Sequence, residues 1–223
     1  MSRGPRLVLL GKQGAGKGTQ AGGLSERYGI EHVSTGDLFR AAAAAGTSAG
    51  KEAEQYMNRG DLVPDDLTLR IVAERFAEDG LVDRGFVLDG FPRTLPQAET
   101  LEDVLHGHPL DLVIILEVPT DIVLDRIAGR RVCENCGTTY HVNAPPKEDW
   151  TCDVCGGKVV QREDDSEEAV MRRLELYQEE TVPIIDFYQR LDKLVVVDGT
   201  GSGADVFARL VAQVDQRLKT LRT

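Results

Sequence analysis

A glycine-rich loop near the start of the chain has the composition and spacing of a phosphate-binding site. Residues 11–19 read Gly-Lys-Gln-Gly-Ala-Gly-Lys-Gly-Thr and follow a short apolar run, residues 6–10. Backbone N–H groups converge on a phosphate only where side chains do not intrude, and glycines leave that space. Lys17 would bring positive charge to the β- and γ-phosphates. The strict pattern has Ser or Thr directly after the lysine, whereas here Gly18 precedes Thr19; a plain glycine-rich turn is the alternative.

Four cysteines form a second pattern with chemical meaning. Cys133-x-x-Cys136 and Cys152-x-x-Cys155 are separated by fifteen residues. Each Cys-x-x-Cys turn can place two thiolates on one side of a metal, and two turns complete a tetrahedral site typical of zinc. Because protein ligands fill all four positions, the metal would be structural rather than catalytic. Two redox pairs or four free thiols are the alternatives.

These patterns need a scaffold that positions them. Apolar runs predict strands at residues 6–10, 85–88, 112–118 and 194–197, and the stretch between the first two strands is predicted to be helical. Periodicity, capping residues and glycines predict helices at residues 17–27, 34–45, 51–59, 64–77, 96–105, 121–127, 166–186 and 204–221. A strand, a phosphate loop and a helix at the start are typical of a nucleotide-binding α/β fold.

Composition restricts the class of protein further. The chain has 223 residues and a formal net charge of -11. That length fits one large domain, or one domain with small insertions. The acidic balance disfavours nucleic acid as a partner. No apolar run is long enough for a signal peptide or a membrane span, and the cysteines cluster as metal ligands do, so we expect a cytoplasmic protein without a membrane partner.

The loop form Gly-x-Gly-Lys-Gly-Thr and the run from Asp89 to Arg93, Asp-Gly-Phe-Pro-Arg, resemble the adenylate kinase family of P-loop nucleoside monophosphate kinases, in its bacterial long-lid form. The resemblance extends from residue 6 to about residue 214; Gln13 departs from it, because the family usually has Pro there. It implies a P-loop-type parallel sheet flanked by helices, with a small helical AMP-binding insertion and a zinc-containing lid. The implied divisions are a core (1–33, 64–128 and 166–223), an AMP-binding helical segment (34–63) and a lid, the cysteine segment (129–165).

The resemblance also implies three sets of site residues. The transferred phosphoryl group would be surrounded by Lys17, Arg93, Arg130, Arg162 and Arg173. ATP would contact Gly14, Ala15, Gly16, Lys17, Gly18, Thr19, Arg126, Thr139, Tyr140 and Gly201. AMP would contact Thr35, Arg40, Asp61, Leu62, Val63, Gly90, Phe91, Pro92, Arg93, Gln97, Arg162 and Arg173.

Gln97 and Arg126 from these sets, together with Asp89, have specific expected roles. The amide of Gln97 would pair with N1 and the 6-amino group of adenine; a solvated helix glutamine is the alternative. Asp89, after an apolar strand, would act on magnesium through water, with a turn or helix-capping aspartate as the alternative. Arg126 would stack on the ATP base, and its spacing of four from Arg130 predicts that both lie on one helix face.

Some charged residues are left out of the site. Arg131 and Arg172 have acidic neighbours and are predicted to be surface residues. The four histidines are predicted to be surface or packing residues, because the attacking phosphate oxygen is already ionised and needs no general base. They are His32, His106, His108 and His141.

The resulting hypothesis is an adenylate kinase that reversibly converts ATP and AMP into two ADP, with Mg²⁺ on the ATP and structural Zn²⁺ in the lid, and that acts as a monomer in adenine nucleotide homeostasis. Lid closure would exclude water and so prevent ATP hydrolysis. One alternative is another nucleoside monophosphate kinase, with GTP as donor or UMP or CMP as acceptor. A second is a zinc-ribbon binding module, and a third is a P-loop switch or motor ATPase, which needs no acceptor clamp.

Overall fold

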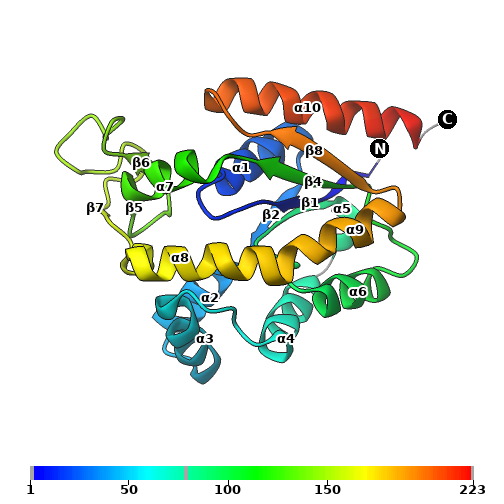
Figure 1. Ribbon diagram of the computed structural model, residues 1–223, viewed down its shortest axis with the longest axis horizontal. Coiled ribbons are helices and arrows are strands. Elements are labelled where there is room, and N and C mark those ends of the chain that lie inside the picture. The colour runs from blue at the N-terminus through cyan, green and yellow to red at the C-terminus, as the bar shows by residue number, and fades with distance from the viewer. Residues whose placement is uncertain (1–2, 78–79, 222–223) are drawn as a thin grey trace.

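A parallel five-stranded sheet forms the centre of the computed structural model, which describes residues 3–77 and 80–221. Its strand order is β2-β3-β1-β4-β8. The strands are β1 (Arg6–Leu10), β2 (Glu31–Ser34), β3 (Phe86–Asp89), β4 (Leu112–Glu117) and β8 (Leu194–Asp198). Helices lie on both faces of this sheet (Figure 1). The predicted α/β class with a parallel sheet flanked by helices is therefore confirmed.

Most helices begin and end within three residues of the predicted positions. The helices are α1 (Lys17–Tyr28), α2 (Thr35–Ala44), α3 (Ser48–Arg59), α4 (Asp65–Phe76), α5 (Leu81–Arg84), α6 (Leu95–Val104), α7 (Thr120–Ala128), α8 (Glu167–Leu176), α9 (Val182–Arg190) and α10 (Gly203–Thr220). Helix α5 was not predicted, and the helix predicted over residues 166–186 is divided into α8 and α9. Side-chain caps fix several starts: Ser34 accepts from the N–H of Asp37 at α2, and Ser166 from that of Ala169 at α8.

The helix predicted over residues 166–186 is interrupted. A π-helical turn, Tyr177–Thr181, separates α8 from α9, and Pro183 stands in the first turn of α9. Proline has no N–H to donate to the preceding turn and its ring crowds the carbonyl there, so a wider turn before it relieves both conflicts. The two helices still follow one another along one side of the sheet (Figure 1).

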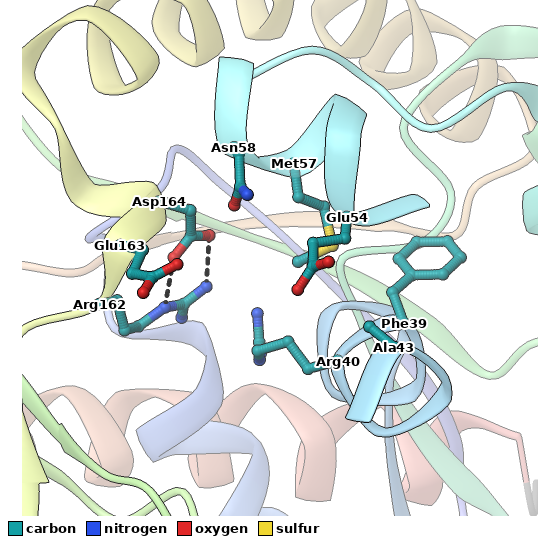
Figure 2. Close-up of a pocket in the computed structure, with 9 residues that line it drawn as sticks. All are labelled: Phe39, Arg40, Ala43, Glu54, Met57, Asn58, Arg162, Glu163 and Asp164. Carbon is teal, nitrogen blue, oxygen red and sulfur yellow. Dashed lines mark hydrogen bonds and ion pairs between the residues drawn. The ribbon is translucent and has the colours of Figure 1, made fainter. Parts of the chain in front are cut away.

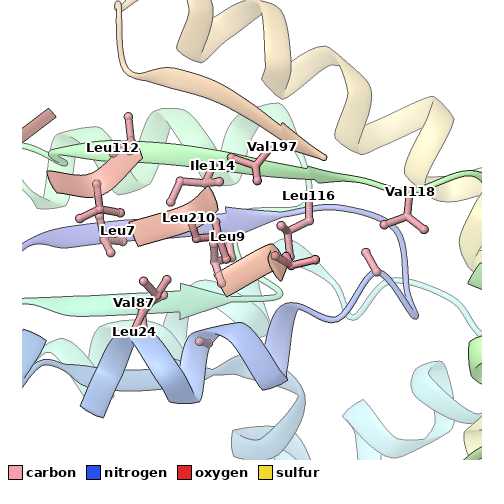
Figure 3. Close-up of a cluster of buried hydrophobic side chains, with 14 of the residues drawn as sticks. Leu7, Leu9, Leu24, Val87, Leu112, Ile114, Leu116, Val118, Val197 and Leu210 are labelled. Carbon is pink, nitrogen blue, oxygen red and sulfur yellow. The ribbon is translucent and has the colours of Figure 1, made fainter. Parts of the chain in front are cut away.

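Alternating strand residues supply two apolar cores, one on each face of the sheet. Leu7 and Leu9 of β1 face a cluster completed by Leu24 of α1 and Leu210 of α10 (Figure 3). Val8 and Leu10 of β1 belong to the opposite cluster, which α6 and α9 cover. Because both faces are buried, β1 reads as a continuous apolar run rather than an alternating one. These two cores fix the positions of the strands, and the loops of the site begin at the carboxyl-terminal ends of those strands.

Strand β2 was not predicted, and the helical stretch expected between β1 and β3 contains it. It lies at the edge of the sheet and pairs only with β3, with Ser34 opposite Asp89. Of its four residues only Val33 is buried. An edge strand this short and polar carries no periodic apolar signal, which explains the wrong prediction.

Two small units project from this framework. Helices α2 and α3 pack on one another in the helical segment. In the cysteine segment, β5 (Arg130–Cys133), β6 (Thr139–His141) and β7 (Val159–Val160) form a separate antiparallel sheet in the order β6-β5-β7. A 3-10 turn, Glu163–Asp165, leads from it into α8. Across the described ranges, no helix has the length and apolar character needed to cross a membrane.

Candidate active site

The phosphate loop joins the end of β1 to the start of α1. Gly14 and Gly16 have φ angles of 80° and 98°, a left-handed conformation that glycine adopts without strain. A Cβ atom on Gly14 would lie 2.8 Å from Cγ1 of Ile127, so a side chain there would collide with α7. Lys17 is the first residue of α1. The N–H groups of the helix start and the lysine ammonium are therefore available to one anion.

Lys17 is held inside this loop. Its Nζ donates to two carbonyl oxygens of the loop, at 2.8 and 3.0 Å. Burial lowers the pKa of Lys17 to about 8; the charges of Arg93 and Arg130 act in the same direction, and Asp89 opposes them. The ammonium group of Lys17 thus lies among other cations and is poorly solvated. An incoming phosphate would stabilise its charge.

Asp89 ends β3 beside the phosphate loop and caps none of the described helices. Nε2 of His32, on the neighbouring strand β2, lies 3.7 Å from its Oδ2. Burial alone would raise the pKa of Asp89, but His32 and the charge of Lys17 outweigh it and hold the pKa below its usual range. A partly buried carboxylate kept ionised at this edge suits the predicted role beside a hydrated cation.

Arg93 lies in the loop between β3 and α6. Its Nε donates to the carbonyl oxygen of Gly90 at 2.8 Å, and its own carbonyl accepts from Thr181 Oγ1 at 3.0 Å. Burial, and next the charge of Arg173, lower the pKa of Arg93 to about 10, which leaves the guanidinium charged at neutral pH. The peptide bond between Phe91 and Pro92 in the same loop is cis.

Gln97 is only 2% exposed, which excludes the alternative of a solvated helix glutamine. It lies in the first turn of α6, whose N-cap is Thr94. Its Oε1 accepts from the backbone N–H of Arg93 at 2.8 Å, and its Nε2 donates to Asp65 Oδ1 at 2.6 Å. The amide is therefore buried and held by partners on both sides, next to Arg93, and its contact with the acceptor base stays a prediction.

A pocket of about 180 Å³ lies between the helical segment and residues 162–164 (Figure 2). Arg40 enters it from α2 and Arg162 from the chain before α8, and both line it. Arg40 also forms an ion pair with Asp37, one turn earlier on α2. The two guanidinium groups are the donors that could bind a monophosphate here, and they share the lining with the carboxyl groups of Glu54, Glu163 and Asp164.

Two other predicted AMP contacts, Thr35 and Asp61, join neighbouring elements. Thr35 Oγ1 donates to the carbonyl oxygen of Gly90 at 2.9 Å, which joins the start of α2 to the loop that carries Arg93. The carboxylate of Asp61 forms ion pairs with Arg59 and with Arg172 on α8. The backbone of residues 61–63 is thus tied to α8, and its predicted contact with the acceptor base stays a prediction.

Two consecutive aspartates hold three of the predicted transfer arginines. Arg130 binds Asp165 through both Nε and Nη2, with the Nε contact at 2.8 Å. Arg162 binds Asp164 through two contacts of 2.8 and 2.7 Å, and Arg173 Nη2 reaches the same carboxylate at 2.9 Å. Paired donors aligned by a carboxylate keep planar guanidinium groups in fixed orientations. The three arginines are thereby oriented around residues 164–165.

The prediction that Arg126 and Arg130 share a helix face was wrong. Helix α7 ends at Ala128, and Arg130 begins β5. Arg126 instead donates to the carbonyl oxygens of Ala15 in the phosphate loop, at 3.2 Å, and of Gly199 after β8, at 3.0 Å. A spacing of four places residues on one face only where the helix continues, and here the chain leaves the helix at position 129.

The four cysteines form a potential metal site. Their sulfur atoms all lie within 4.8 Å of one another. The pairs Cys133–Cys155 and Cys136–Cys152 have Sγ–Sγ distances of 3.4 and 3.6 Å, too long for disulfides. Four thiolates about 2.3 Å from one zinc ion would be separated by about 3.8 Å. The residues present therefore fit a tetrahedral metal, and among the residues described no other such cluster occurs.

The lid residues predicted to touch ATP lie close to this site. The hydroxyl of Tyr140 donates to Cys152 Sγ at 3.4 Å and accepts from the N–H of Asp153 at 2.8 Å. Thr139 is exposed on β6, and Gly201 follows β8 with φ of 94°. Tyr140 is thus engaged within the cysteine segment, and the ATP contacts of Thr139, Tyr140 and Gly201 stay predictions.

Sequence reasoning missed several residues of this region. His32 beside Asp89 was assigned to surface or packing because the reaction needs no general base, and β2, the strand that carries it, was not recognised. Asp65, Asp164 and Asp165 were not singled out, although the acidic run directly after Arg162 was a usable signal for ion pairs. As predicted, Arg172 is paired with acidic neighbours. Arg131 is not among the arginines bound by Asp164 and Asp165, and its guanidinium lies 6.0 Å from the ring centre of Trp150.

Comparisons with known proteins agree with this site. A family model described as adenylate kinase matches residues 9–193. The chain is 49% identical over 215 residues to an adenylate kinase of Thermodesulfovibrio yellowstonii, covering 95% of this chain and all of the relative. It is 51% identical over 205 residues to an adenylate kinase of Bacillus subtilis, covering 91% of this chain and 94% of the relative. The phosphate loop, the arginines held by Asp164 and Asp165, and these matches together show that the chain belongs to the adenylate kinase family.

Proposed function

We propose that this chain transfers the γ-phosphoryl group of ATP to AMP and so produces two molecules of ADP. The observation that carries the proposal is the convergence of cations at one edge of the sheet. The charges of Arg93 and Arg130 act on Lys17, and those of Arg173, Arg40 and Arg162 act on Arg93. Phosphoryl transfer needs this feature, because charge is spread over the equatorial oxygens of the moving group.

The residues divide the reaction between them. The phosphate loop and Lys17 hold the β- and γ-phosphates of ATP, and Arg126 lies on the ATP side of the loop. Arg40 and Arg93 bind the phosphate of AMP. One of its ionised oxygens attacks the γ-phosphorus, the new P–O bond forms as the bond to the β-phosphate oxygen breaks, and ADP leaves. No proton has to be removed from the attacking oxygen, so the site requires no general base.

Arg130, Arg162 and Arg173 stabilise the charge of the moving group. Asp164 and Asp165 hold these guanidinium groups in place before substrate arrives, so little reorganisation is needed during the reaction. Magnesium bound with ATP would neutralise the β- and γ-oxygens, and Asp89 would hold it through water. Closure of the cysteine segment over the site would exclude water as a competing acceptor.

Three further statements belong to the same proposal. The metal of the cysteine site is zinc with a structural role, since all four ligands come from the protein and leave no open position. Gln97 reads the adenine of AMP. The protein acts as a monomer in the cytoplasm, without nucleic acid or membrane partners.

The test is ADP formation from magnesium-ATP with AMP, GMP, CMP and UMP in parallel. Rapid turnover with AMP alone is expected. Activity with another monophosphate would retain the phosphoryl chemistry and reject adenine recognition by Gln97. No transfer to any acceptor would overturn the proposal.

A pair of lysine variants sharpens this test. Lys17→Met should reduce turnover by about a hundredfold or more, because it removes a preorganised charge at the phosphates. Lys12→Met is the matched control: it lies in the same loop, but its Nζ binds Val118 O and Thr120 Oγ1, at 3.2 and 2.9 Å. If circular dichroism shows that both variants are folded and their activities are equal, the role of Lys17 is rejected.

A further inference from the structure

The amide of Gln97 is held by two partners that cannot exchange roles. On one side the carboxylate of Asp65 accepts from Nε2 at 2.6 Å, and on the other the backbone N–H of Arg93 donates to Oε1 at 2.8 Å. A carboxylate offers only acceptors and a backbone N–H only a donor. If the amide turned over, oxygen would face carboxylate and NH₂ would face N–H. Two repulsive contacts would replace two hydrogen bonds, so the direction of the amide is fixed.

Asp65 is itself fixed in position. It is the first residue of α4, and its second oxygen, Oδ2, accepts from Thr94 Oγ1 at 2.9 Å. Thr94 is the N-cap of α6 and also accepts from the N–H of Gln97. The carboxylate therefore links the start of α4 to the start of α6, two helices that pack on one another. These contacts give Asp65 no freedom to follow a turned amide.

The direction of the amide matters for the base it can read. A primary amide has two N–H groups and two oxygen lone pairs, and the two partners use one of each. One donor and one acceptor remain, in a fixed order. Adenine presents an acceptor at N1 and a donor at its 6-amino group. Hypoxanthine, the base of IMP, presents a donor at N1 and an acceptor at O6, the reverse order.

We propose that Asp65 is a positioning residue that sets the choice between 6-amino and 6-oxo purine monophosphates, by fixing the direction of the Gln97 amide. This inference rests on the proposed function, because it requires Gln97 to face the acceptor base. Asp65 does not touch substrate; it acts through Gln97. With Asp65 in place, a 6-oxo purine meets donor against donor and acceptor against acceptor.

The test compares kcat/KM for AMP and IMP in the full-length enzyme with magnesium-ATP. In Asp65→Asn, the new amide can present either its oxygen or its NH₂ to Gln97, and the hydroxyl of Thr94 can accept as well as donate. The two amides can then turn together, opposed only by the N–H of Arg93. We expect the AMP-to-IMP ratio to fall by about tenfold, the effect of losing one charged hydrogen bond.

Two controls separate this effect from general damage. Asp66→Asn removes the same charge from the same first turn of α4, at an exposed position, and should leave the ratio unchanged. Gln97→Leu removes the reading amide and should bring the ratio to its lowest value. A loss of helix stability alone would lower kcat/KM for both substrates without changing their ratio. If Asp65→Asn does not fold, Asp65→Ser, whose hydroxyl donates or accepts, takes its place.

The outcomes distinguish the two proposals. An unchanged ratio in a folded Asp65 variant, with Gln97→Leu lowering the ratio, would overturn the role of Asp65 alone. An unchanged ratio in Gln97→Leu would reject base reading by Gln97 and the inference with it. A wild-type enzyme without AMP activity would instead reject the proposed function. A lower ratio in the Asp65 variant but not in Asp66→Asn would support the inference.

Discussion

The helical segment and the cysteine segment both project from the sheet, but different forces hold them together. The apolar cluster beneath the helical segment consists of Phe39, Ala53, Val63 and Leu67. That segment also packs closely on α8: a Cβ atom on Gly60 would lie 2.3 Å from the carbonyl oxygen of Ala169. In the cysteine segment the buried cluster is Cys133, Cys152 and Val159, with Tyr140 packed against it.

The contrast shows how a small insertion becomes ordered. Two helices lying on a core can bury apolar side chains against it and against each other, so ordinary packing is enough. A short irregular loop with three small strands cannot bury enough apolar area to offset its conformational entropy. Two of its buried residues, Cys133 and Cys152, belong to the potential metal site, so its order would depend on a bound ion.

The largest expected effect comes from breaking the metal site. Structural zinc stabilises isolated zinc-finger peptides by about 10–16 kcal/mol, more than the apolar cluster of this segment can replace. In Cys133→Ser, or after chelation of the wild type, the cysteine segment should lose its order. Trp150 is the only tryptophan in the chain and lies in this segment, so its fluorescence reports the change directly. The emission should shift to longer wavelength, and the Tm should fall.

Zinc addition provides the control for this experiment. It should restore the Trp150 signal of the chelated wild type but not that of Cys133→Ser. An unchanged emission and Tm after complete metal removal would contradict the structural role of the ion.

Truncation of Phe39 should destabilise the helical segment. Phe39→Ala removes a large buried side chain and should cost about 3–5 kcal/mol of local stability. We expect a higher KM for AMP, an unchanged Trp150 emission and no response to zinc. Val104→Ala, a truncation at a 55% exposed position, serves as the control. It should change neither the local stability nor the KM for AMP. A red shift of Trp150 in Phe39→Ala would show that the two segments do not order independently.

Asp164 lies near the end of the cysteine segment and lines the pocket shared with the helical segment, and its replacement should have an intermediate effect. Burial raises the pKa of this carboxyl, but the hydrogen bond and charge of Arg162, with the charges of Arg173 and Arg40, outweigh it and hold the pKa below its usual range. Asp164→Asn weakens contacts to two charged groups and should cost about 1.5–3 kcal/mol.

The sign of the pH dependence follows from this lowered pKa. Because the folded protein binds the proton less well than the unfolded chain, the stabilisation is complete above the unfolded pKa of about 3.9 and is lost as the pH falls toward the folded value. Urea unfolding of Asp164→Asn should therefore show a flatter acid limb than the wild type. Identical acid limbs would contradict the lowered pKa.

The smallest effect is expected for Gln13, the residue where the phosphate loop departs from the family pattern. Its Nε2 donates to Asp165 Oδ1 at 3.0 Å and so connects the loop to the base of the cysteine segment. Its Oε1 is buried without a partner. Gln13→Ala should change stability by at most about 0.5–1.5 kcal/mol, the value of one hydrogen bond. A loss of turnover comparable to that of Lys17→Met would show that this connection orders the phosphate loop itself.

Sequence patterns were informative where local spacing carries the information. The phosphate loop could be recognised because strand, glycines, lysine and helix are consecutive. The cysteine pairs could be recognised because each metal-binding turn is local and the two turns repeat. The strands of the sheet interior were predicted from continuous apolar runs, since burial on both faces removes the polar residues that would interrupt them.

Elements at the edges and boundaries were not predicted as well. Strand β2 was not recognised because it is short and polar and buries only Val33, whereas β8 at the other edge has an apolar run. The position of His32 beside Asp89 was missed for the same reason. The shared helix face of Arg126 and Arg130 failed at a helix end, where spacing no longer defines a direction. The chain breaks the helix at residue 129, and only the strand pairing of β5 orients Arg130.

The sequence alone indicated the family, the phosphate loop, the four cysteines of the potential metal site and the apolar strands of the sheet. Each of these is recognisable from residues that are neighbours or that repeat with a fixed period. The tertiary structure decided which groups meet over long separations: Asp65 with Gln97, Asp165 with Arg130, and His32 with Asp89. Such pairs leave no periodic trace in a single sequence. They exist only because the parallel strands bring the ends of distant segments to one edge of the sheet.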